Sequence, residues 1–68
     1  MTEATKIARR RMELGMKQPE VASKAGIPLS TYQKLDNGSN DFNKANVITA
    51  IKIAKALETT VEKLMEES

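Results

Sequence analysis

The 68-residue sequence contains no cysteine and no histidine. This absence excludes disulfides, thiolate nucleophiles, imidazole bases and the usual zinc ligands, so packing alone has to hold the core together. Aromatic residues are also scarce, with one tyrosine, one phenylalanine and no tryptophan. Because a chain this short rarely forms a cleft that encloses a substrate, we expect no catalytic site, no metal, no cofactor and no small-molecule ligand.

The charge is small in total but unevenly distributed. The formal net charge is +2, with basic residues prevailing over residues 1–55 and acidic residues over 56–68. No apolar run is long enough for a membrane helix, and the first residues lack the apolar core of a signal peptide. We therefore expect a soluble, cytoplasmic protein with no membrane partner.

The chain is expected to be all-α. Alanine, lysine, glutamate, leucine and methionine abound, and β-branched residues occur singly rather than in alternating runs. Glycines end the first two segments and an Asn-Gly pair ends the third. The pattern predicts a single domain over residues 1–68 with five helices, at about residues 3–14, 18–25, 29–36 and 45–57 and in a short segment after Thr59.

The first predicted helix carries an arginine on its apolar face. Helical spacing brings these residues to that face: Ala4, Ile7, Ala8 and Arg11. An unpaired charge on a buried face is costly, so Arg11 needs a partner. Consecutive helical residues point about 100° apart, so Arg9 and Arg10 face away from Arg11 and are expected to be solvated.

The last two predicted helices also carry apolar side chains at helical spacing. One stripe of the fourth helix contains Val47, Ile51, Ala54 and Leu57, with Ala50 and Ile53 beside it. Thr59 and Thr60 both offer a cap for the last helix, and Glu62 stands at capping-box distance from Thr59. Little chain remains after Leu64 and Met65 to cover them.

Residues 18–37 have the pattern of two short helices joined by a three-residue turn. Such a pair needs a small residue where the backbones touch, a glycine at the turn and apolar residues at fixed inward positions. These demands are met by Val21, Ala22, Ala25, Gly26, Ile27, Tyr32 and Leu35.

With these residues the chain resembles the phage repressor and Cro family of helix-turn-helix DNA-binding proteins. The junction at residues 14–18, the Asp-Asn-Gly ending at residues 36–38 and the segment 53–57 are similar to that family's pattern in the same order. The resemblance implies a lambda-repressor-like fold with five helices. It also implies double-stranded DNA as the partner.

The resemblance further implies which side chains meet DNA. The third helix would enter the major groove and present Leu29, Ser30, Thr31, Gln33 and Lys34 to the bases. The phosphate backbone would be contacted by Lys17, Gln18, Asn40, Asn43 and Lys44. In the family an arginine of the first helix meets an acidic residue that closes the third, which implies a structural ion pair between Arg11 and Asp36.

The resulting hypothesis is a transcriptional regulator that binds an operator as a homodimer and represses by occluding polymerase. The expected dimer interface is the end of the fourth helix and the last helix, with Leu57, Leu64 and Met65. Such a protein would work at the nucleoid. The alternative is a protein-interaction module of the same fold, such as an antitoxin; an enzyme such as a nuclease comes third, because the carboxylates form no metal-binding motif.

Overall fold

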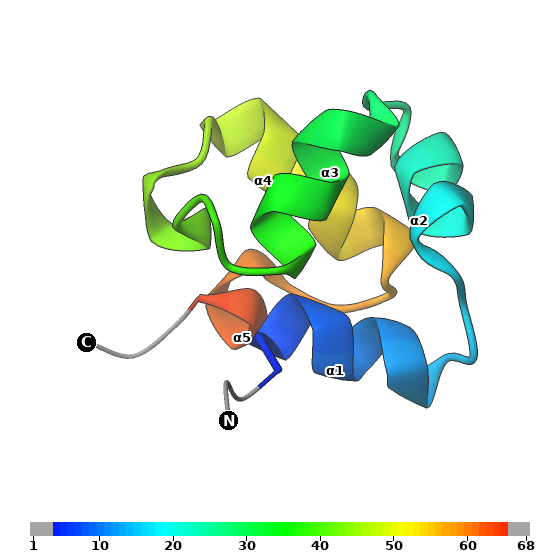
Figure 1. The fold of residues 1–68 in the computed structure, drawn as a ribbon. Coiled ribbons are helices and arrows are strands. Elements are labelled where there is room, and N and C mark those ends of the chain that lie inside the picture. The colour runs from blue at the N-terminus through cyan, green and yellow to red at the C-terminus, as the bar shows by residue number, and fades with distance from the viewer. Residues whose placement is uncertain (1–3, 66–68) are drawn as a thin grey trace.

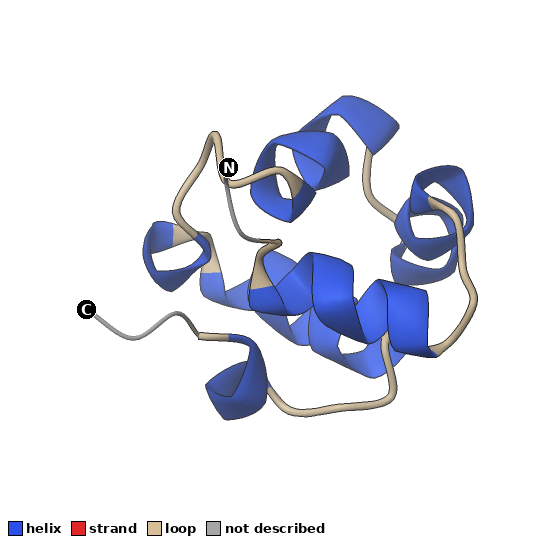
Figure 2. Cartoon of the chain, turned by 60° about the horizontal axis from the view of Figure 1, so that its bottom comes forward, coloured by secondary structure: helices blue, strands red, loops and turns tan. Residues whose placement is uncertain are grey.

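The computed structural model describes residues 4–65, and every regular element in that range is helical (Figure 2). In chain order the elements are α1 (Lys6–Glu13), α2 (Gln18–Ala25), α3 (Leu29–Asp36), the 3₁₀ turn η1 (Phe42–Lys44), α4 (Val47–Ala56) and α5 (Val61–Leu64). The predicted all-α architecture with five α-helices is confirmed. No helix in the described range is long and apolar enough to cross a membrane.

The predicted bounds of α2 and α3 agree with the structure, and those of α1 and α4 are too wide. Helix α1 begins at Lys6 because Thr5 has extended backbone and its hydroxyl accepts a hydrogen bond from the Ala8 amide at 3.0 Å. The predicted start at Glu3 lies outside the described residues. Helix α4 begins at Val47 because Asn46 caps it: the Asn46 Oδ1 accepts a hydrogen bond from the Ile48 amide at 2.9 Å.

The turn between α2 and α3 depends on glycine. Gly26 has φ 72°, a left-handed conformation in which a side chain would be strained. The next amide, that of Ile27, donates back to the Ala22 carbonyl at 3.0 Å, which closes the end of α2. Helix α2 then packs against both α3 and α4 (Figure 1). This packing fixes the helix-turn-helix unit on the rest of the domain.

The core lies where the five helices meet. Its largest fully buried side chains come from all five: Ile7, Val21, Tyr32, Ile53, Leu57 and Leu64. The predicted stripe of α4 is partly wrong, because Val47 is 71% and Ile51 42% exposed, whereas Ala50 and Ile53 are buried. The start of α4 is apolar on several sides, so the spacing of apolar residues alone does not determine which face packs against α2.

The C-terminal segment folds back onto the domain. Helix α5 packs against α1 and α4 (Figure 1). Thr60 caps this helix, because its hydroxyl accepts a hydrogen bond from the Lys63 amide at 3.3 Å. Leu57 and Leu64, both expected at a dimer interface, are consequently buried inside the domain, at 0% and 2% exposure. Met65 is 40% exposed and remains on the surface.

Candidate nucleic-acid interface

Helix α3 divides sharply into an inner and an outer face. Tyr32, Leu35 and Asp36 are buried. The exposed residues are those expected to read bases: Leu29, Ser30, Thr31, Gln33 and Lys34. Leu29 is a large apolar side chain at 38% exposure, so the outer face offers an apolar contact as well as polar groups.

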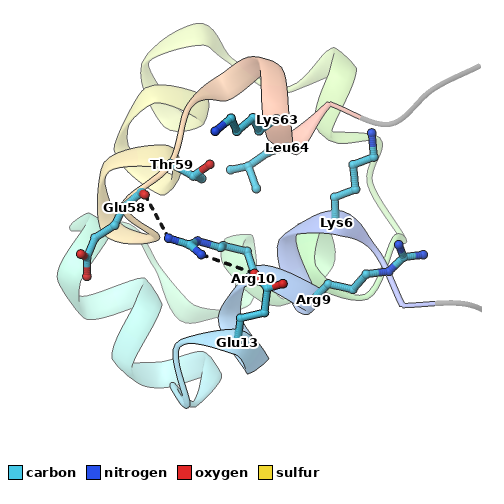
Figure 3. Close-up of a pocket in the computed structure, with 8 residues that line it drawn as sticks. All are labelled: Lys6, Arg9, Arg10, Glu13, Glu58, Thr59, Lys63 and Leu64. Atoms are coloured by element: carbon cyan, nitrogen blue, oxygen red, sulfur yellow. Dashed lines mark hydrogen bonds and ion pairs between the residues drawn. The ribbon is translucent and has the colours of Figure 1, made fainter.

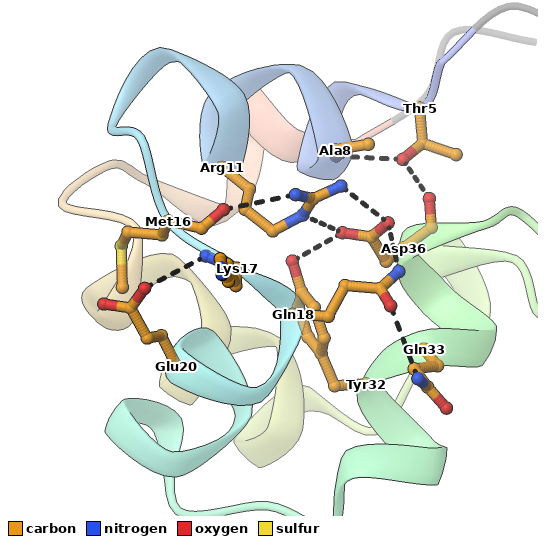
Figure 4. A network of polar contacts seen from close by, with 10 residues as sticks. All are labelled: Thr5, Ala8, Arg11, Met16, Lys17, Gln18, Glu20, Tyr32, Gln33 and Asp36. Carbon is orange, nitrogen blue, oxygen red and sulfur yellow. Dashed lines mark hydrogen bonds and ion pairs between the residues drawn. The ribbon is translucent and has the colours of Figure 1, made fainter.

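A polar network ties the inner end of α3 to α1 (Figure 4). The Arg11 Nε donates to Asp36 Oδ2 at 2.8 Å and its Nη2 to Oδ1 at 3.4 Å, which confirms the expected ion pair. The Tyr32 hydroxyl donates to Asp36 Oδ2 at 2.7 Å, and Arg11 Nη1 donates to the Met16 carbonyl at 3.2 Å. Asp36 is 4% exposed, so its charge is satisfied almost entirely by protein groups.

This network changes the pKa of each ionisable member. Burial raises the pKa of Asp36, but hydrogen bonds from Arg11, Tyr32 and Gln18 outweigh burial and leave that pKa below its ordinary value. The hydrogen bond to Asp36 raises the pKa of Arg11. Burial, followed by the bond to Asp36, raises the pKa of Tyr32. At neutral pH the network therefore consists of a carboxylate, a guanidinium and a neutral phenol.

We expect the free energy of unfolding to fall in acid as Asp36 becomes protonated. The folded-state pKa lies below the ordinary value of 3.8, so Asp36 stabilises the fold above that pH and loses its contribution as the pH falls toward the folded-state pKa. Thermal unfolding followed by circular dichroism between about pH 5 and about pH 2 measures this loss. The stability of Asp36→Asn should depend less on pH over that window than the stability of the wild-type protein. An equal pH dependence in both proteins would show that Asp36 is not the group responsible.

The start of α2 meets α3 through the same network (Figure 4). Gln18 Nε2 donates to Asp36 Oδ1 at 2.9 Å, and Gln18 Oε1 accepts from Gln33 Nε2 at 3.3 Å. Lys17 is exposed just before it, and its amide donates to Glu20 Oε1 at 3.2 Å. Of the two residues expected to contact phosphate here, Lys17 is on the surface and Gln18 is engaged with α3.

An open groove runs between α3 and the start of α4. Thr31 of α3 lines it together with Asn40 and Lys44, so the structure brings these two expected phosphate contacts beside the outer face of α3. Asn43 lines a different hollow, with Val47 and Met65.

The expected DNA contacts did not include the other polar residues that line this groove, which are Ser39, Asp41, Asn46 and Thr49. The available signal is Asn46 itself, an asparagine directly before an apolar helix and hence an N-cap.

The three consecutive arginines point to different surroundings. Arg10 was expected to be solvated, but its Nε donates to the Leu57 carbonyl at 2.9 Å. Its Nη2 donates to the Glu58 carbonyl at 3.1 Å (Figure 3). Glu58 has φ 53°, so Arg10 satisfies carbonyls where the chain turns left-handed after α4. Arg9 is exposed.

The hollow around Arg10 lies apart from the candidate interface. Figure 3 shows its lining from α1, the α4–α5 turn and α5: Lys6, Arg9, Arg10, Glu13, Glu58, Thr59, Lys63 and Leu64. None of these residues belongs to α2 or α3. The three consecutive arginines therefore do not form one nucleic-acid patch, because Arg9 and Arg10 line this hollow whereas Arg11 bonds to Asp36.

Comparison with family models matches residues 7–64 to a helix-turn-helix family. The chain belongs to the helix-turn-helix family of Cro and repressor proteins. This helix-turn-helix protein is accordingly a DNA-binding regulator, and the match extends from α1 to the end of α5. Neither a curated protein nor a solved structure matches the chain. Within residues 4–65, no three carboxylate, histidine or cysteine side chains gather in a group that could hold a metal ion.

Proposed function

We propose that this regulator binds a specific duplex sequence with α3 in the major groove and represses transcription by occluding polymerase. The observation that carries the proposal is the outer face of α3, whose side chains are exposed and whose Thr31 shares a groove with Lys44. Side chains on a helix read base edges, and flanking cations hold the backbone and fix the register. A protein held in this way on an operator excludes polymerase without further chemistry.

Three outer residues of α3 have assigned contacts in this proposal. Leu29 cannot donate or accept a hydrogen bond, so its contact is the methyl group of a thymine. Thr31 donates to a phosphate or a base edge, and Lys34 reaches guanine or phosphate. Asn40 and Lys44 contact the backbone beside Thr31, across the groove toward α4.

Affinity for random-sequence duplex across a salt series tests DNA binding directly. The logarithm of the affinity should fall linearly with the logarithm of the salt concentration, with a slope of about −0.9 for each phosphate contact. Lys44→Ala and Lys17→Ala should each make the slope shallower. Absence of binding to any duplex at low salt would favour the alternative, a protein-interaction module such as an antitoxin.

Exposed apolar side chains at the start of α4 and the end of α5 bear on the oligomeric state. Four exposed apolar side chains form a surface, which we call the α4 apolar surface: Val47, Ile48, Ile51 and Met65. Val47 and Met65 line one hollow, which joins the start of α4 to the end of α5. Exposed apolar clusters of this kind mark contact sites. The α4 apolar surface replaces the buried Leu57 and Leu64 as the proposed dimer contact.

The proposed function favours a second copy of this chain as the partner of the α4 apolar surface. One short recognition helix reads only a few base pairs, and a domain of net charge +2 has little charge with which to hold DNA alone. Two copies related by a two-fold axis would place their half-sites about one helical turn, roughly 34 Å, apart. The start of α4 lies beside α3 across the groove, so a contact there keeps both recognition helices near the duplex.

Ile48→Glu should convert the species on an operator duplex from a dimer to a monomer and weaken its affinity. Ile48 is 64% exposed, so the substitution puts a charge into the contact while leaving the core intact. Sedimentation at micromolar protein measures the species. Met12→Glu is the matched control, since Met12 is 53% exposed on α1 and lies outside the α4 apolar surface. A dimer that persists in Ile48→Glu would exclude this surface.

A further inference from the structure

The hollow around Arg10 gathers positive charge that the proposed DNA contacts do not use. Its volume is about 300 Å³, at the lower end of the range for ligand pockets in proteins. None of its lining residues belongs to α2, to α3 or to the groove of Thr31. The lining holds two carboxylates and four cationic side chains, which are Lys6, Arg9, Arg10 and Lys63 (Figure 3). An excess of positive charge in a concave site attracts anions.

The guanidinium of Arg10 is held in place by the protein itself. Its Nε and Nη2 donate to the carbonyls of Leu57 and Glu58 at 2.9 and 3.1 Å, which ties α1 to the turn before α5. Because these bonds orient the guanidinium in advance, binding a ligand costs it little conformational freedom. A guanidinium has five N–H donors, and three of those on Arg10 have acceptors within residues 4–65. One N–H on each terminal nitrogen is left to donate to an anion.

The two carboxylates of the hollow do not neutralise its cations. The Glu58 carboxylate lies 3.6 Å from the ammonium of Lys24, a residue of α2 outside the lining. Glu13 Oε1 accepts from Arg10 Nη1 at 3.4 Å, a long bond between side chains that are 66% and 33% exposed. Ion pairs as exposed as this one are weak, so an anion of higher charge can displace Glu13 from Arg10. Within residues 4–65 the Lys63 ammonium has no carboxylate partner.

We propose that this hollow binds a phosphate group between Arg10 and Lys63. A phosphate monoester carries up to about two negative charges and three strong acceptor oxygens. A guanidinium bonds two such oxygens at once, and a lysine ammonium attracts the group as a point charge. A carboxylate, with a single charge, gains less from the same cations. The phosphate has two possible sources, a free phosphorylated compound and the backbone of DNA, and the site does not depend on α3 reading bases.

Titration of the full chain with inorganic pyrophosphate, followed by nuclear magnetic resonance at constant ionic strength, tests the proposal. The Arg10 Nε–H signal and the Leu64 amide signal should shift and saturate together, and acetate should shift them far less. Lys63→Ala should weaken the affinity for pyrophosphate by a factor of roughly 2 to 5. Glu13→Gln should strengthen it by a similar factor, because Arg10 loses the carboxylate that competes with the ligand. Lys52→Ala is the matched control, since it removes an exposed lysine of α4 that does not line the hollow.

Binding to random-sequence duplex across a salt series then identifies the source of the phosphate. If Lys63→Ala makes the slope of log affinity against log salt concentration shallower, the phosphate belongs to DNA. An unchanged slope, or no duplex binding at all, assigns the site to a free phosphorylated compound, contrary to the expectation from the sequence that the chain binds no small molecule.

Three results would overturn the proposal and leave the proposed function standing. The first is a set of shifts that does not saturate at millimolar pyrophosphate. The second is an equal loss of affinity in Lys52→Ala and Lys63→Ala, which would show that only the net charge of the protein matters. The third is an affinity for pyrophosphate that Glu13→Gln leaves unchanged or weakens.

Discussion

Replacing Arg11 by methionine should lower the free energy of unfolding by about 3 kcal/mol. The Asp36 carboxylate is 4% exposed, and the substitution removes the bonds from Nε at 2.8 Å and from Nη2 at 3.4 Å. Only Tyr32 and Gln18 would then bond to a buried charge that has lost its counterion. For a domain of this size the midpoint of thermal unfolding should fall by roughly 12 to 24 °C.

Arg9→Met is the matched control for this prediction. It makes the same chemical change on the exposed side of the same helix, where interactions of a charged side chain contribute little, so the free energy of unfolding should change by less than about 1 kcal/mol. Equal midpoints for Arg11→Met and the wild-type protein would show that the ion pair does not hold α1 to α3.

Substitutions on the outer face of α3 should reduce affinity for the operator much more than affinity for random duplex. Leu29→Ala and Thr31→Ala should each cost about 1 to 3 kcal/mol of operator binding if each side chain reads a base. If Leu29 contacts a thymine methyl, replacing that thymine by uracil should have the same effect as Leu29→Ala. Binding to operator and random duplex across a salt series separates the two kinds of contact.

Lys34 is distinguished from these residues by its salt dependence. If Lys34 contacts a phosphate, Lys34→Ala should weaken binding to all sequences. The slope of log affinity against log salt concentration should then become shallower by about 0.9. Lys24→Ala is the control, because the Lys24 ammonium lies 3.6 Å from the Glu58 carboxylate, away from α3. If Leu29→Ala, Thr31→Ala and Lys34→Ala all leave operator affinity unchanged, α3 is not the reading helix.

Local signals predicted the part of the fold that carries the candidate interface. Gly26 and the three-residue turn around it specify where α2 ends and α3 begins, and both bounds are confirmed. The position of Arg11 on an apolar face predicted a buried partner, and Asp36 is that partner. The inward positions of Tyr32 and Leu35 also determined which residues of α3 face outward.

The remaining features depend on contacts that sequence spacing does not encode. The start of α4 is apolar at Val47, Ile48 and Ile51, so only packing against α2 decides which side is buried. Arg10 bonds to the Leu57 carbonyl 47 residues away, a contact with no local signature. The same holds for the link from Gln18 to Gln33, which depends on how α2 crosses α3.

Selection of bound sequences from a random duplex pool at near-physiological salt is the most direct test of specific DNA recognition by α3. It measures DNA binding and sequence specificity together, and the operator sequence is a result of the selection. We expect enrichment of a motif with two related half-sites, whose centres lie about one helical turn, roughly 34 Å, apart. A pool that stays unenriched after repeated rounds would contradict specific DNA recognition by α3.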